Sequence, residues 1–169
     1  IGVGVIVVAV LAFAATRPDV SSYERSLSMA ASPDVVYGVV SDFHRWGEWS
    51  PWEDLDPAMA RTFSGAEAGV GAVYEWSGNK KAGSGRMEVL EADAPGAATI
   101  DLQFLKPFKA HNVIRFTLVE DVGATAVTWT MTGPTTFMTK VMGIFKSMDS
   151  MVGPDFEKGL AQLKAAAEG

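Results

Sequence analysis

The sequence predicts an α+β domain in which a long C-terminal helical region covers the apolar face of an antiparallel sheet. Two observations support this prediction. Apolar and polar residues alternate in short segments between residues 60 and 132, and from Thr136 to Ala167 the apolar spacing changes to three or four residues. Alternation is typical of strands with one buried face, and the longer period is typical of a helix that can cover that face.

The predicted strands are short segments bounded by turn residues. The first, Tyr23–Met29, opens a domain that we expect to cover residues 23–168, and its alternation places Arg25 on the same face as Leu27. The others are Ala60–Ser64, Gly71–Ser77, Gly85–Ala92, Thr99–Leu105, Asn112–Glu120 and Ala124–Thr132. Together they predict a sheet of about six or seven strands, connected as an antiparallel meander.

Two short helices are expected between the first strand and the rest of the sheet. Ser32 and Pro33 mark the start of one of them, because serine is a favoured N-cap and proline is tolerated in the first helical turn. The helix that covers the sheet is expected over Thr136–Ala167. It is predicted as one helix or as two in series, with Gly153-Pro154 as a kink or break.

Residues 44–52 form a tryptophan segment, His-Arg-Trp-Gly-Glu-Trp-Ser-Pro-Trp, that holds three of the five tryptophans of the chain. It follows a short apolar helix and precedes the strands, so we expect it to plug the junction between helix and sheet. Small-molecule sites are concave and largely aromatic. A buried tryptophan also contributes a large apolar area wherever it sits. The segment therefore either lines a ligand site or completes the core.

The first sixteen residues, 1–16, carry no charge and are almost wholly aliphatic. As a helix they would extend about 24 Å, a little less than the ~30 Å hydrocarbon core of a bilayer. We expect a single-pass membrane anchor, followed by a linker over residues 17–22, with the side of the membrane left open. Ala12-Phe13-Ala14 resembles a signal-peptidase site, so a secreted or periplasmic protein is the alternative. A buried core element is a third interpretation.

Composition excludes several classes of function. The formal charge of −6, with Lys80-Lys81 as the longest basic pair, argues against a nucleic-acid partner, because phosphate binding needs clustered basic residues. The chain has no cysteine, which excludes disulfides, thiolate nucleophiles and cysteine-ligated metals.

The order of elements and several motifs resemble one known family. The motifs are Ala31–Tyr37, Asp42–Trp52, Ser64-Gly65, Gly69–Ala72, Trp76–Asn79 and Phe156–Leu160. They resemble the polyketide cyclase/dehydrase-like branch of the START and birch-pollen-allergen superfamily, also called SRPBCC. The resemblance implies a helix-grip fold, in which a curved antiparallel sheet wraps around the long C-terminal helix. It also implies a hydrophobic cavity between sheet and helix that is open at one end and binds lipids, polyketides or similar molecules.

The candidate ligand-binding residues are aromatic and methionine side chains on the predicted concave face, in the tryptophan segment and on the covering helix. They are Trp46, Trp49, Trp52, Tyr74, Trp76, Met87, Phe104, Phe116, Trp129, Met131, Met142 and Phe145. Methionine tolerates varied shapes, which suits a lid over changeable hydrophobic ligands, although ordinary packing explains such spacing as well.

No catalytic set is evident. His44 and His111 have no obvious partner, and the neighbours of Glu75 and Arg115 indicate that both face solvent. Asp42, His44 and Glu48 lack a second imidazole, so we assign no metal site.

We therefore predict that the protein binds or transfers a small hydrophobic molecule, with no cofactor, no nucleic-acid partner and a membrane contact through its N-terminal segment. One alternative is a cyclase or dehydratase that uses His111 or Glu75 for proton transfer. A non-catalytic scaffold or stress-response module is the other.

Overall fold

The computed structural model describes residues 2–145 and 147–169, and the side chains of residues 2, 3, 145 and 148 lie outside this description. One antiparallel sheet of seven strands dominates the fold, in the order β1-β7-β6-β5-β4-β3-β2. The strands are β1 (Val20–Met29), β2 (Ala60–Gly65), β3 (Ala72–Ser77), β4 (Ser84–Asp93), β5 (Ala97–Lys106), β6 (Ala110–Asp121) and β7 (Ala124–Pro134). Every predicted strand is confirmed. Most strands extend a few residues beyond their predicted ends.

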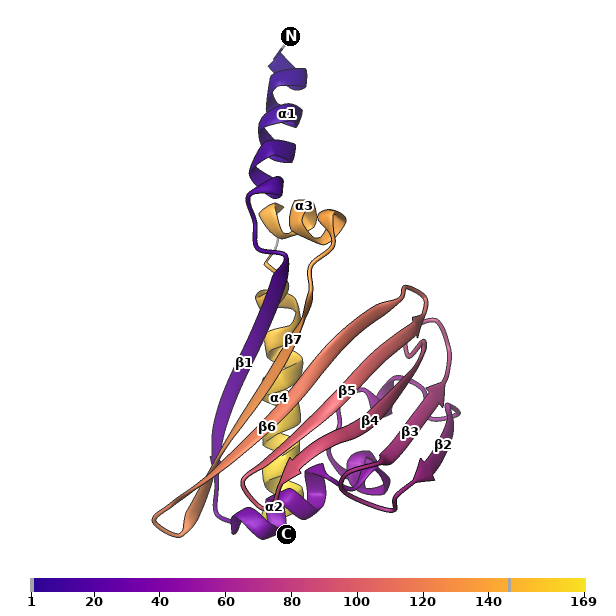
Figure 1. Ribbon diagram of the computed structural model, residues 1–169, viewed down its shortest axis with the longest axis vertical. Helices are drawn as coiled ribbons and strands as arrows, with labels where there is room; N and C mark the ends of the chain where they lie inside the picture. The colour runs from indigo at the N-terminus through magenta and orange to yellow at the C-terminus, as the bar shows by residue number, and fades with distance from the viewer. Residues whose placement is uncertain (1, 146) are drawn as a thin grey trace.

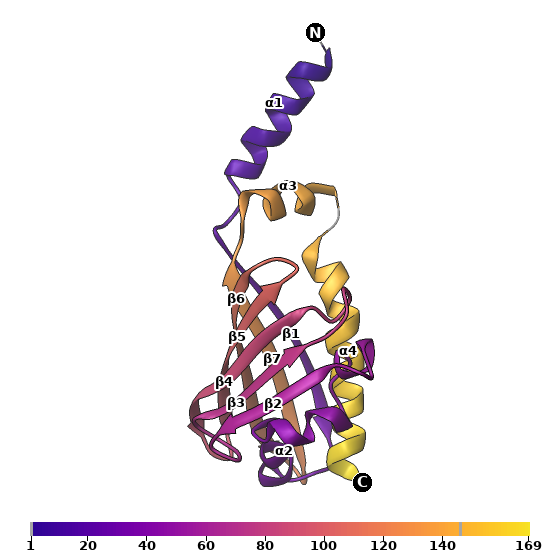
Figure 2. The same cartoon turned by 90° about the vertical axis from the view of Figure 1, so that its right-hand side faces the viewer.

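The sheet curves, and the long helix α4 (Met148–Glu168) lies along its concave face (Figures 1 and 2). Alternation in the strands explains this arrangement. On β6, Ile114, Phe116 and Leu118 are buried, whereas Arg115 between them is exposed. Phe156, Leu160 and Leu163 of α4 are buried as well, so the helix and the sheet share one core. The predicted fold class is confirmed.

Three short helical segments lie between β1 and β2 in the chain. Ser32 caps α2 (Pro33–Val40), and its side chain accepts a hydrogen bond from the amide of Val35, as predicted for a helix start. Asp42 caps the 3₁₀ helix η1 (Phe43–Glu48) by accepting from the amide of His44 at 2.9 Å. A further 3₁₀ turn, η2 (Glu53–Leu55), follows the tryptophan segment.

The C-terminal region contains two helices in series, but their boundary is not at Gly153-Pro154. Helix α3 (Phe137–Phe145) ends before Ser147, which caps α4 by accepting from the amide of Ser150 at 3.1 Å. Pro154 lies inside α4 on an exposed position. The expected break is therefore wrong, because a serine N-cap six residues before the glycine starts a new helix that continues through the proline.

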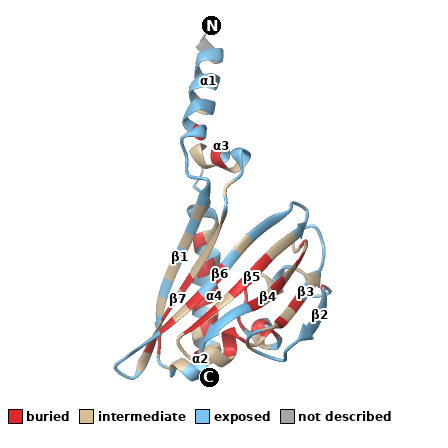
Figure 3. Ribbon diagram, viewed as in Figure 1, coloured by how far each residue is buried: buried red, intermediate tan, exposed pale blue. Residues whose placement is uncertain are grey.

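The N-terminal segment forms α1 (Gly2–Ala15), a helix of 14 residues that contacts α3. Its described side chains are mostly exposed (Figure 3). Among the described residues, none of the helices combines the length and the apolar character needed to cross a bilayer, so the predicted single-pass anchor is not confirmed. Strand β1 begins at Val20, within the segment expected as a linker, and Val20 pairs with Pro134 of β7.

Candidate functional site

The concave face of the sheet brings most of the predicted ligand-binding residues together. Six of them are buried in the hydrophobic core: Trp46, Trp49, Tyr74, Met87, Phe116 and Trp129. Four are half-buried and pack against that core: Trp52, Trp76, Phe104 and Met131. The strands and the tryptophan segment therefore form a continuous aromatic interior, which we define by these ten residues.

Of the other two predicted residues, one is described and does not join this interior. Met142 lies on α3, which contacts α1, and about half of its surface is exposed. The side chain of Phe145 lies outside the described residues. Half of the methionines were expected on a helix over the sheet. However, Met138 and Met142 belong to α3, which stands beyond the end of the sheet (Figure 2), so these two methionines do not cover the concave face.

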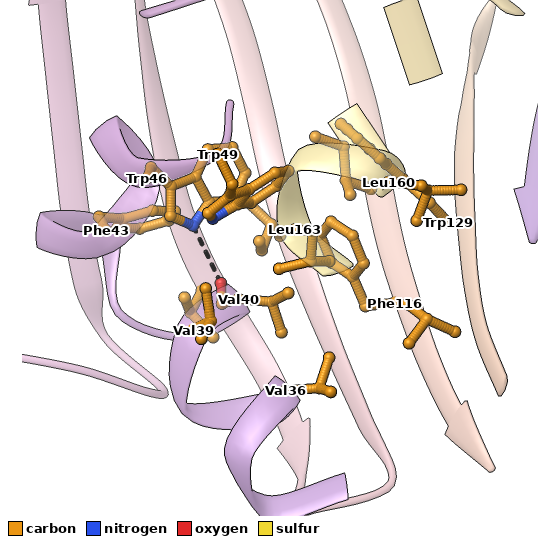
Figure 4. Packing of buried hydrophobic residues seen from close by; sticks show 14 of the residues in the cluster. Val36, Val39, Val40, Phe43, Trp46, Trp49, Phe116, Trp129, Leu160 and Leu163 are labelled. Atoms are coloured by element: carbon orange, nitrogen blue, oxygen red, sulfur yellow. Dashed lines mark hydrogen bonds between the residues drawn. The ribbon is translucent and has the colours of Figure 1, made fainter. Parts of the chain in front are cut away.

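The tryptophan segment reaches the centre of the interior through a chain of ring contacts. The centroids of Trp46 and Trp49 are 4.8 Å apart, and those of Trp49 and Trp129 are 5.5 Å apart. Trp129 in turn stacks on Phe156 of α4 with a centroid distance of 4.4 Å. The predicted plug between helix and sheet is confirmed, and its rings connect η1 to α4 (Figure 4).

The indole N–H groups of this interior differ in their partners. Trp46 donates from Nε1 to the carbonyl oxygen of Val40, and Trp76 donates to that of Ala82, each at 3.1 Å. The indole nitrogens of Trp49 and Trp129 are buried, and neither has a hydrogen-bond partner among the described residues.

Helix α4 lies close to the sheet at two buried glycines. A Cβ atom on Gly159 would lie 2.8 Å from Cζ3 of Trp129, and one on Gly153 would overlap the guanidinium of Arg25. The close approach leaves little space between helix and sheet. A surface hollow of about 290 Å³ lies at the seam of β1 and α4, lined by Arg25, Ser26, Leu27, Glu157 and Leu160. None of the ten interior residues lines it, so the candidate aromatics fill the space where the resemblance implies a cavity.

A polar cluster holds η2 onto the other edge of the sheet. Tyr74 donates from its hydroxyl to Oε1 of Glu53, and Nε of Arg61 donates to Oε2 of the same carboxylate, both at 2.6 Å. Burial and the hydrogen bond to Glu53 raise the pKa of Tyr74 above its ordinary value. The hydrogen bond to Glu53 also raises the pKa of Arg61. The sequence analysis did not single out Glu53 or Arg61, although Glu53 directly follows the tryptophan segment.

A second ion-pair cluster joins β1 to α4. Arg25 contacts Asp149 through two nitrogens, at 2.9 and 2.8 Å, and donates from Nε to Glu157 at 3.1 Å. The hydrogen bond from Arg25 lowers the pKa of Asp149. An arginine on the predicted apolar face of the first strand was the available signal for this cluster.

Both histidines have carboxylate partners, which corrects the expectation that they lack them. Nδ1 of His44 lies 2.9 Å from Oδ1 of Asp42, and Nε2 of His111 contacts Oδ1 of Asp101. Both imidazoles are more than half exposed, outside the aromatic interior. Burial raises the pKa of Asp101, but hydrogen bonds from His111 and Gln103 outweigh it and lower the pKa overall. Glu75 and Arg115 are exposed, as predicted.

A curved antiparallel sheet that grips a long C-terminal helix over an aromatic interior defines a helix-grip protein of the SRPBCC class. A family model described as polyketide cyclase/dehydrase and lipid transport matches residues 21–168. The chain belongs to this family, as its motifs predicted.

Solved structures share the fold at low sequence identity. Protein MLL2253 from Mesorhizobium loti has a TM-score of 0.63 and 15% identity over 86% of this chain and 96% of its own. CV1439 from Chromobacterium violaceum has a TM-score of 0.61 and 15% identity over 90% of this chain and 99% of its own. The di-domain ARO/CYC BexL, from the BE-7585A biosynthetic pathway, has a TM-score of 0.63 and 13% identity over 94% of this chain and 53% of its own. No curated protein sequence matches the chain.

Proposed function

We propose that the protein binds a small hydrophobic molecule between its sheet and α4. Family membership supports a hydrophobic ligand-binding or cyclase-like role. The single observation that supports binding in this place is the half-buried part of the aromatic interior, formed by Trp52, Trp76, Phe104 and Met131. These side chains continue the buried core toward solvent. An apolar ligand placed against them would extend the core and remove their exposed surface from water.

Binding at this site requires α4 or the tryptophan segment to move away from the sheet. The aromatic residues already fill the space between them, and α4 lies against the sheet at Gly159. The ion pairs of Arg25 with Asp149 and Glu157 hold the first half of α4 to β1. We expect these pairs to be among the contacts that break when the ligand is admitted.

The proposal favours binding over catalysis. The two groups considered for proton transfer, His111 and Glu75, are exposed and lie outside the aromatic interior. The cluster of Tyr74 with Glu53 and Arg61 does face it, but its hydrogen bonds join η2 to the strands. Burial keeps Tyr74 protonated, which suits a structural hydroxyl donor.

The test compares two neighbouring residues on opposite faces of β5. Phe104 is half-buried on the concave face and contacts the ring of Trp76 at 5.8 Å between centroids, whereas Leu105 is exposed on the outer face. Saturable binding of the fluorescent probe N-phenyl-1-naphthylamine is expected for the wild-type protein and for Leu105→Glu. Phe104→Glu should weaken it at least about tenfold, because the ligand would then bury a charge.

Native mass spectrometry provides a second measurement. Protein purified under native conditions from its own host should carry a hydrophobic compound that is released on denaturation. Equal probe binding by the two variants would contradict the proposed site. Failure of the wild-type protein to bind the probe or to retain any compound would contradict the proposed function.

A further inference from the structure

Two buried hydrogen-bond donors stand at the centre of the aromatic interior without acceptors. The indole nitrogens of Trp49 and Trp129 have no partner among the described residues, although both side chains are about 1% exposed. Buried N–H groups in folded proteins nearly always have a partner. Trp46 and Trp76 follow that rule, since each donates to a backbone carbonyl. Trp49 and Trp129 therefore differ from Trp46 and Trp76 in having buried indole donors with no partner among the described residues.

The two donors belong to different elements that meet at one place. Trp49 ends η1, Trp129 lies on β7, and their rings pack edge to face. Both rings also contact Phe116, and Trp129 lies against Gly159 of α4. The two indole donors thus meet where the tryptophan segment, the sheet and α4 join (Figure 4).

We propose that Trp49 and Trp129 determine ligand specificity by donating hydrogen bonds to oxygen atoms of a hydrophobic ligand. This inference rests on the proposed function and names the ligand class: an apolar molecule that carries carbonyl oxygens. An indole N–H can only donate, so the matching ligand group must be an acceptor.

The two indole donors should make the site bind a hydrocarbon less tightly than a ketone of the same shape. A hydrocarbon that displaces α4 would leave both indole donors buried and unpaired, as they are without ligand. A ketone of the same shape would pair at least one of them. Sites that offer buried hydrogen-bond donors reject analogues that lack the acceptor, because the donors then remain unsatisfied.

The experiment uses two compounds of nearly the same shape, 2-acetylnaphthalene and 2-ethylnaphthalene, which differ in a carbonyl group. The wild-type protein should bind the ketone about tenfold more tightly than the hydrocarbon. Trp49→Phe and Trp129→Phe should each lower this ratio at least about twofold. Binding of 2-ethylnaphthalene by each variant shows that it is folded and that its site is intact.

A second measurement needs no variant. In ¹⁵N-labelled wild-type protein, the indole N–H signals of Trp49 and Trp129 should move downfield with 2-acetylnaphthalene and not with 2-ethylnaphthalene, which serves as the control for ring currents. The signal of Trp46 provides an internal reference, because its donor is already paired with the carbonyl oxygen of Val40 and Trp46 is not one of the half-buried residues of the proposed site.

Equal affinity for the two compounds, with equal indole shifts, would overturn the specificity inference and leave the proposed function standing. An unchanged ratio in both variants would overturn the assignment to these two residues. Binding of neither compound would overturn the inference and the proposed function together.

Discussion

Arg25 and Trp129 lie directly opposite each other on β1 and β7, and each lies against a glycine of α4. Gly153 faces the guanidinium of Arg25, and Gly159 faces the indole ring of Trp129. Because the two glycines are six residues apart on one helix, these contacts set the position of α4 along the sheet. They also explain why little space remains between helix and sheet.

The contact at Gly159 predicts a cost for a methyl group there. Alanine favours a helix over glycine by about 0.5–1 kcal/mol, but a Cβ at Gly159 would meet the rigid ring of Trp129 at 2.8 Å. We expect Gly159→Ala to lower the free energy of unfolding by about 1–2 kcal/mol, measured by urea denaturation. In Gly143→Ala on α3, where a Cβ would meet nothing within 4 Å, stability should stay equal or rise. A stabilised Gly159→Ala variant would contradict the close packing of α4.

The Arg25 cluster predicts a pH-dependent attachment of α4. Because the pKa of Asp149 is lowered in the folded state, its contribution to stability is present above its ordinary value of 3.8 and is lost as the pH falls through the lowered value. We expect Arg25→Gln to be less stable than the wild-type protein near neutral pH. The difference should shrink at acidic pH, as measured by denaturation at several pH values.

The matched control for this variant is Arg115→Gln. It removes the same charge from an exposed side chain whose guanidinium donates to Thr99. The double variant of Arg25→Gln and Asp149→Asn should be less destabilised than the sum of the single variants. Additive effects at neutral pH would show that the ion pair does not stabilise α4.

The hydroxyl of Tyr74 predicts a late tyrosine ionisation. Its raised pKa means that its contribution to stability is full below the ordinary value of 10.0 and is lost as the pH rises above it. In an absorbance titration of tyrosinate in the folded protein, Tyr74→Phe should remove a fraction that ionises above pH 10. The same variant should lose about 1–2 kcal/mol of stability, because the Glu53 carboxylate loses one donor.

Tyr37→Phe is the control for this titration. The Tyr37 side chain packs against the same core, and no hydrogen bond of its hydroxyl is seen within the described residues. Loss of the same late fraction in the control would show that the hydrogen bond to Glu53 is not its cause.

Pro154 predicts a gain in stability on substitution. It lies at an exposed position within α4, where proline cannot donate to the carbonyl four residues earlier. Pro154→Ala should raise the free energy of unfolding by about 1–3 kcal/mol in urea denaturation. Asp155→Ala, at the next exposed position, controls for helix propensity. A Pro154→Ala variant with a lower free energy of unfolding than the wild-type protein would contradict this prediction and would show that Pro154 stabilises the fold.

Several elements could be predicted from local pattern. The strands were found because alternation of the kind seen at Ile114, Arg115 and Phe116 reports a sheet with one buried face. Ser32 revealed the start of α2 because capping depends only on nearby backbone groups. The boundary between α3 and α4 was missed. Ser147 was an available N-cap signal, but Gly153-Pro154 was the stronger local breaker, and only packing of α4 on the sheet maintains the helix through it.

The candidate site was predicted in part. Residue type and strand phase placed Trp49, Phe116 and Trp129 in one interior. The prediction for Met142 was wrong, because the covering region divides into two helices and Met142 belongs to the one that stands beyond the end of the sheet. The partners of Arg25 and Tyr74 could not be found, because Asp149 lies 124 residues from Arg25 and Glu53 lies 21 residues from Tyr74.

The sequence by itself determined the sheet, its apolar face, the aromatic nature of the interior and the family, since periodicity and motifs are local properties of the chain. Tertiary structure alone decided how closely α4 approaches that face, which indole groups keep a hydrogen-bond partner and which carboxylates meet Arg25 and Arg61. Those features depend on distances between residues that are remote in the chain, and a pattern of residue types does not contain such distances.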